Sequence, residues 1–133
     1  MHKPAFLKLL ICIDLVVCAA MALPWVSTQF LAALSYLNAL AELGGGPINF
    51  PANAFFFVNL AGIFGVAYNV IMLKSDESWI HLINNVARLC VVALLAFYIG
   101  IQGLPQIFLL FMLTELVGFY VTKRWLHGLA DAS

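Results

Sequence analysis

Three charged residues interrupt long apolar runs in this chain of 133 residues, namely Asp14, Arg88 and Glu115. A charge at the middle of a bilayer costs from about 2.5 kcal/mol on insertion scales to roughly 10 kcal/mol or more in simulations. Such residues therefore pair with one another, and they commonly mark proton relays, ion pathways or ligand sites. Two carboxylates beside one guanidinium leave one negative charge, which a proton or another hydrogen-bond donor would compensate.

Polar residues on two of the apolar runs are candidates for that second donor. His81, Asn84, Asn85 and Arg88 follow the spacing i, i+3, i+4, i+7, which places them on one face of a helix. Asn59 and Asn69 share a face of the preceding apolar run with glycine. The candidates for a ligand or proton site are therefore Asp14, Arg88, Glu115, Asn84, Asn85, Asn69, Asn59 and His81.

The composition indicates an integral membrane protein. Hydrophobic residues make up 65% of the chain and charged residues 9%, whereas soluble domains average roughly 25% charged residues. Such a chain cannot cover a globular surface with polar groups, which excludes soluble enzymes, secreted disulfide scaffolds and disordered tails. Six Lys and Arg residues balance six Asp and Glu residues, so no basic surface for nucleic acid is expected.

Four apolar stretches are long enough to span a membrane, because a spanning helix needs roughly 20 mostly apolar residues. They cover residues 5–24, 54–73, 79–101 and 104–122. Asp14 interrupts the first stretch, which argues against a cleaved signal peptide. We therefore expect an all-α integral membrane protein, a four-transmembrane-helix bundle that forms a single domain over residues 1–133.

The basic residues near the ends of the spans predict the orientation. They are Lys3, Lys8, Lys74, Lys123 and Arg124. All of them fall on one side of the membrane if both termini are cytoplasmic, and the connections on the other side, 25–53 and 102–103, contain no Lys or Arg. The pattern predicts both termini in the cytoplasm, and a compact chain without sorting motifs favours a bacterial inner membrane.

Residues 27–43 are expected to form an amphipathic external helix between the first and second spans. Ser27 or Thr28 could cap its start, and the glycine run that follows would end it. Polar residues such as Ser35 and Asn38 share one face while apolar residues crowd the other, which is typical of a helix on the membrane surface. A fifth, weakly hydrophobic span is the alternative, although it would place basic residues on both sides.

Short connections between consecutive spans allow depths in the membrane to be compared. The turn 102–103 places Glu115 within one helical turn of Arg88 in depth. At about 1.5 Å per residue, Asp14 lies ~14 Å deep, Arg88 ~15 Å and Glu115 ~11 Å. We therefore predict that the three residues meet inside the bundle. Gly65 falls level with Arg88, where a glycine could either bring helices close together or leave room for the arginine side chain.

Three features of the chain together resemble a known family: the run Ala41-Glu42-Leu43-Gly44-Gly45, the span with Asn59 and Asn69, and Ala87-Arg88 in the third span. The layout is similar to that of the DoxX-like and TMEM35-like small membrane proteins, four-helix bundles with an extended external segment and internal charges. In DoxX proteins the comparable Glu and Gly-Gly run belongs to the second span itself, whereas here it precedes that span. The resemblance implies an accessory or chaperone-like membrane role, or a redox association, and it transfers no catalytic residue.

The leading hypothesis for the function is a small accessory subunit that binds a larger membrane protein complex, or its lipid, through intramembrane helix surfaces. The charged cluster of Asp14, Arg88 and Glu115 would then fix the helix register. The alternatives are a small dimeric proton-coupled transporter and a lipid-binding or lipid-modifying protein that uses this cluster. No nucleophile motif or metal-ligand spacing favours an enzyme, so we expect no metal or cofactor. The expected partners are the lipid bilayer and either a membrane protein or a second copy of the chain.

Overall fold

The structure is a computed structural model that describes residues 3–46, 48 and 50–130. Helices make up 84% of these residues, and no strand occurs among them. Four helical segments are long and apolar enough to cross a membrane, namely Ala5–Ala22, Ala54–Lys74, Ser78–Gly100 and Gln106–Gly128. The prediction of an all-helical protein with four helices suited to a membrane is thereby confirmed.

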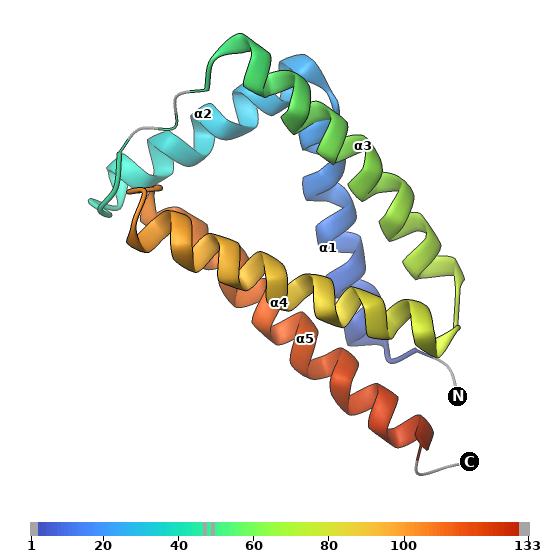
Figure 1. The fold of residues 1–133 in the computed structure, drawn as a ribbon. Coiled ribbons are helices and arrows are strands. Elements are labelled where there is room, and N and C mark those ends of the chain that lie inside the picture. Colours follow the sequence, from blue (N-terminus) through green and yellow to red (C-terminus); the bar gives the residue numbers. More distant parts are fainter. Residues whose placement is uncertain (1–2, 47, 49, 131–133) are drawn as a thin grey trace.

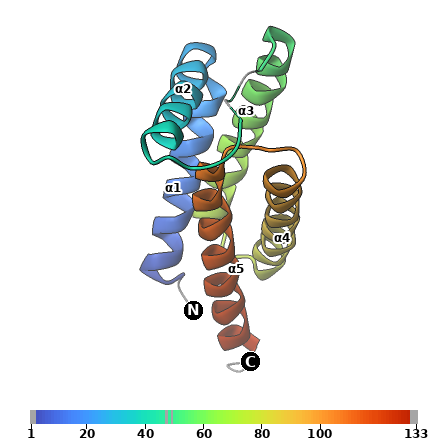
Figure 2. The same ribbon diagram turned by 90° about the vertical axis from the view of Figure 1, so that its left-hand side faces the viewer.

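The helices form two packed pairs. In chain order they are α1 (Ala5–Ala22), α2 (Pro24–Leu40), α3 (Ala52–Lys74), α4 (Ser78–Gly100), the 3-10 helix η1 (Gln106–Phe108) and α5 (Leu109–Ala130). α1 packs mainly against α3 and α4 mainly against α5, while α5 also contacts α1 and lies between α1 and α4 (Figure 2). The start of α1, the connection from α3 to α4 and the end of α5 lie at the same end of the molecule (Figure 1).

α1 and α3 approach closely because glycines of α3 face α1. A Cβ atom added at Gly62 would collide with the backbone at the end of α1, and one added at Gly65 would meet the side chain of Cys18. Small residues allow this kind of close approach between helices in membranes. Of the two roles that the sequence allows for Gly65, helix approach is therefore the one that the structure shows.

α2 begins and ends three residues earlier than the predicted segment 27–43. The chain bends at Leu23, which has an extended conformation, and Pro24 opens the new helix, where its fixed φ suits the first turn. The hydroxyl groups of Ser27 and Thr28 each donate a hydrogen bond of 3.0 Å to the Pro24 carbonyl. The predicted capping role of these two residues is therefore wrong.

The C-terminal end of α2 forms a Schellman motif before the glycine run is reached. The Leu43 amide donates to the Asn38 carbonyl at 3.0 Å, and the Glu42 amide donates to the Ala39 carbonyl at 3.1 Å. Glu42 takes the left-handed position of this motif with φ of 52°, although glycine is the usual residue there. A glutamate therefore ends the helix.

The buried face of α2 also differs from the predicted one. Asn38 is only 6% exposed, because its side chain accepts a 2.9 Å hydrogen bond from the Ile107 amide and thereby ties α2 to η1. Tyr36 and Leu40, by contrast, are 67% and 66% exposed. The expectation that Asn38 lies on a polar outer face is wrong, and the exposed face of α2 is largely apolar.

α5 continues to Ala130, beyond the predicted end of the span at residue 122. The added turns are held by packing, because Trp125 is only 5% exposed. The Trp125 ring meets the His81 ring edge-on at 4.9 Å between centroids. Trp125 also joins the apolar cluster that contains Leu7 and Met72, so this end of α5 belongs to the core.

Lys3 closes the end of α3. Its Nζ donates to the carbonyl oxygens of Met72 at 2.6 Å, Leu73 at 3.0 Å and Ser75 at 2.5 Å. The last carbonyls of a helix have no intrahelical donors, and a lysine near them also interacts favourably with the helix dipole. The start of the chain is therefore fastened to the α3–α4 connection.

Candidate functional site

The three charged residues that the sequence predicts to meet do lie in contact. Arg88 on α4 donates through Nη2 to Oδ2 of Asp14 on α1 at 2.5 Å, and through Nη1 to Oε2 of Glu115 on α5 at 2.7 Å. The side chain of Arg88 is 4% exposed, and each acidic side chain is 20% exposed. Because α1 and α4 belong to different packed pairs, the guanidinium joins the two pairs inside the bundle.

Gly118 makes the space that the guanidinium occupies. A Cβ atom added at this position would lie 2.6 Å from Nη1 and 2.7 Å from Cζ of Arg88. Gly118 lies one helical turn beyond Glu115, so the same face of α5 supplies both the carboxylate and the room beside it. The space that the sequence allowed at Gly65 is therefore found at Gly118.

The arrangement has one more negative than positive formal charge. Arg88 donates to both acids through its terminal nitrogens, and its Nε has no hydrogen-bond partner in the described part of the chain. Removing one member of a buried ion pair costs about 3–5 kcal/mol, because the remaining charge is left without compensation. The cluster therefore links α1, α4 and α5 through one guanidinium, and loss of Arg88 would leave two acidic side chains without compensation.

A small cavity opens between α1 and α5 beside the two carboxylates. It encloses about 170 Å³ and is lined by Asp14, Glu115, Thr114 and Cys18 together with apolar side chains. Carboxylates that remain partly exposed to such a cavity can accept a proton or the hydrogen bond of a small guest. The cavity is thus the place where this cluster could exchange a proton or bind a small polar molecule.

Asn59 and Asn69 fasten α3 to its neighbours. Asn59 Nδ2 donates to the Met21 carbonyl at 2.7 Å and to Ser27 Oγ at 2.9 Å. Asn69 Nδ2 donates to the Gly65 carbonyl of its own helix at 2.9 Å, with Cys18 Sγ at 3.7 Å. Within the described residues neither amide donates to a carboxylate, and these two candidates instead connect α3 with α1.

The polar stripe of α4 is buried, as its helical spacing predicts. His81, Asn84 and Asn85 are 0%, 7% and 4% exposed, and His81 Nε2 lies 2.9 Å from the Ser75 carbonyl. In residues 3–46, 48 and 50–130, none of the three is hydrogen-bonded to a carboxylate, so the predicted compensation by these donors is not seen there.

Side chains from α3 and α5 add to this buried polar interior. Seven buried side-chain atoms have no hydrogen-bond partner in the described residues: Tyr68 Oη, His81 Nδ1, Asn84 Nδ2, Asn85 Oδ1, Arg88 Nε, Thr122 Oγ1 and Trp125 Nε1. Tyr68, Thr122 and Trp125 are single polar groups within apolar runs, so no periodic pattern in the sequence marks them. The packing of α5 on α4 brings Trp125 against His81 of the stripe.

No family model matches the chain, and no curated protein or solved structure matches it. Within the part of the chain that the structure describes, no three His, Cys, Asp or Glu side chains gather in a way that could hold a metal ion. What the site can do therefore follows from its own geometry and charge.

Proposed function

We propose that the protein is a small accessory membrane subunit that binds a larger membrane protein complex, or its lipid, through the outer surfaces of its helices. The observation that carries the proposal is a group of exposed aromatic side chains where α2 and α3 begin. Trp25 is 83% exposed, Phe56 63% and Phe57 66%. The hydrogen bond from Asn59 to Ser27 holds these two helix starts together. We call Trp25, Phe56 and Phe57 the aromatic end.

Aromatic residues on an exposed surface favour a protein partner. Trp, Tyr and Phe are enriched in the cores of protein interfaces, and Trp and Tyr are prominent among the residues that carry most of the binding energy. The neighbouring outer face of α2 adds Tyr36 and Leu40. The hydrogen bonds from Asn59 to the Met21 carbonyl and to Ser27 hold the start of α3 against α1 and α2, so little ordering would be needed when a partner binds.

The proposed orientation places the aromatic end outside the cytoplasm. The basic residues near the span ends favour both termini in the cytoplasm, and the start of α1 and the end of α5 lie together (Figure 1). A bacterial inner membrane is the proposed location. The resemblance to DoxX-like proteins supports the same kind of accessory role, without identifying a partner.

Site-specific photo-crosslinking tests the partner surface. A benzophenone amino acid is placed at Trp25 or Phe56, and Leu113 on α5, which is 57% exposed, serves as the matched control. The proposal expects one polypeptide of constant mass to be captured from positions 25 and 56, and not from position 113. The same products from all three positions would contradict the proposal, and crosslinks to lipid alone would contradict a protein partner at the aromatic end.

A second candidate function is proton-coupled transport by a dimer, which the cavity beside Asp14 and Glu115 favours. Four helices are too few to enclose a pathway, so two protomers would have to do so. Buried polar atoms of α3, α4 and α5 without a partner in the described residues lie between Arg88 and the end of the molecule where α1 starts. They can form the hydrogen bonds that a proton would need along this route.

Replacing Glu115 by glutamine separates this second candidate from a structural role. The protein is reconstituted in vesicles that contain a pH-sensitive dye, and proton entry is followed after an external acid pulse. Transport predicts that Glu115→Gln abolishes proton entry while the yield and oligomeric state are unchanged. If the variant only lowers the yield, the carboxylate is structural.

A further inference from the structure

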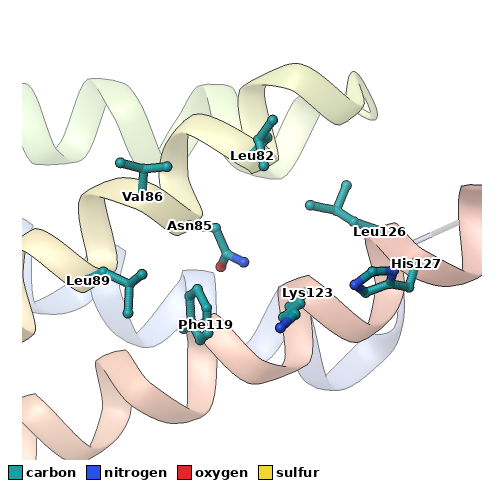
Figure 3. A pocket seen from close by; sticks show the side chains of 8 residues that line it. All are labelled: Leu82, Asn85, Val86, Leu89, Phe119, Lys123, Leu126 and His127. Carbon is teal, nitrogen blue, oxygen red and sulfur yellow. The ribbon is translucent and has the colours of Figure 1, made fainter.

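A groove on the outer face of α4 and α5 combines apolar walls with a basic end. It encloses about 400 Å³. Figure 3 shows the side chains of α4 and α5 that line it: Leu82, Asn85, Val86, Leu89, Phe119, Lys123, Leu126 and His127. We propose that this groove binds one acidic phospholipid, with its phosphate at Lys123 and an acyl chain between Leu89 and Phe119.

The charge at one end of the groove fits an anionic headgroup. An adjoining hollow of about 330 Å³ shares Lys123 and His127 with the groove and adds Arg124. Among the residues that the structure describes, none with an acidic side chain lines either hollow, and all three of these side chains are exposed. Two fixed positive charges and an imidazole therefore face the space where a lipid phosphate would lie.

The middle of the groove offers a buried polar group. Asn85 is 4% exposed, and its Oδ1 has no hydrogen-bond partner in the described residues. Its amide faces the groove from α4, on the opposite wall from Lys123 and Phe119 (Figure 3). A buried amide without a partner is costly; the ester groups of a phospholipid contain only acceptors, so they could accept a hydrogen bond from Asn85 Nδ2.

The rest of the groove is apolar. Val86 and Leu89 on α4 and Phe119 on α5 continue the groove away from the basic end. The order of basic, amide and apolar groups therefore follows the order of phosphate, glycerol ester and acyl chain in a phospholipid. A soluble anion would use only the basic end, whereas a phospholipid matches the whole groove.

The basic end of the groove lies at the membrane boundary where acidic lipids are expected. Lys123 and Arg124 lie near the end of the last membrane-spanning helix, on the side proposed to be cytoplasmic. Acidic lipids attract basic residues at that boundary, and each Lys or Arg contributes about fivefold to the binding. The lipid site does not depend on a protein partner, and its test uses the isolated chain, so the two proposals can fail separately.

Native mass spectrometry of the purified protein tests the site. The protein in detergent is mixed with phosphatidylglycerol or with phosphatidylcholine that has the same acyl chains. One molecule of phosphatidylglycerol is expected to remain bound to the wild-type protein, and phosphatidylcholine is expected to bind clearly less. Lys123→Gln is expected to lower the affinity for phosphatidylglycerol about fivefold, and Asn85→Leu is expected to weaken the binding of both lipids.

Lys74→Gln is the matched control, because Lys74 is an exposed lysine at the end of another spanning helix, α3. It should leave the bound lipid unchanged. Equal binding of the two lipids, or an equal loss in Lys74→Gln and Lys123→Gln, would overturn the proposal. Full displacement of the lipid by inorganic phosphate would also overturn it, because the groove would then hold only an anion.

Discussion

Replacing Gly118 by alanine tests whether Arg88 is truly held between its two carboxylates. Alanine is more favourable than glycine in a helix by about 1 kcal/mol, so at a permissive position the change stabilises the protein. At position 118 the new methyl group would lie 2.6 Å from Nη1 of Arg88, whereas ordinary contacts begin at 3.4 Å. The guanidinium would therefore have to move away from α5.

The size of the effect follows from the bond that this movement breaks. Nη1 is the atom that donates to Glu115 at 2.7 Å. A hydrogen bond to a charged group contributes about 1.5–3 kcal/mol. After the helix propensity gained by alanine is subtracted, Gly118→Ala should lower the free energy of unfolding by about 0.5–2 kcal/mol.

The assay is equilibrium unfolding in mixed micelles with increasing SDS, followed by tryptophan fluorescence. Trp125 is buried and reports loss of packing. Gly100→Ala is the control, because no atom lies within 4 Å of the Cβ that it adds at the end of α4; it should be neutral or slightly stabilising. If Gly118→Ala stabilises the protein as much as Gly100→Ala does, Arg88 moves freely and the reasoning is refuted.

Further predictions concern the charges and the topology. Arg88→Met should lower the free energy of unfolding by about 3–5 kcal/mol, because both acids lose their partner. Adding Asp14→Leu and Glu115→Leu should restore most of the lost stability. A triple variant that is no more stable than Arg88→Met would contradict a purely register-fixing role. Lys3→Met should cost about 1–2 kcal/mol and speed amide hydrogen exchange at the end of α3, whereas exposed Lys8→Met should do neither. Reporter fusions to each terminus should both show cytoplasmic activity, and activity at only one terminus would contradict the predicted orientation.

The charged cluster could be predicted from the sequence because membrane chemistry leaves few alternatives. Asp14, Arg88 and Glu115 are isolated charges in apolar runs, and the rise per residue places them at similar depths. The buried stripe of α4 could be predicted for a related reason, since its spacing matches the helical repeat. Both features depend on local geometry and on the cost of an unpaired charge.

The helix pairing could not be predicted in the same way. The short connection between α3 and α4 allows their depths to be compared but does not decide which helix packs against α3, and α3 packs mainly against α1. That choice depends on the fit of Gly62 and Gly65 against α1, which is a property of two distant segments.

The ends of α2 and α5 were also not predictable from the local sequence pattern, because they depend on backbone geometry and on tertiary packing. The bend at Leu23 lets Pro24 open α2, and a glutamate takes the left-handed position at its end. α5 extends because Trp125 takes a buried position against His81 of α4. The apolar pattern of the span alone gives no sign of these tertiary contacts.

The most direct test of the proposed accessory role is native mass spectrometry of the tagged protein after gentle extraction from its own membrane. The proposal predicts a complex of fixed stoichiometry with another membrane polypeptide. It also predicts that this complex dissociates when Trp25 and Phe56 are replaced by alanine. Recovery of the chain as a lone monomer in several mild detergents would contradict the proposal.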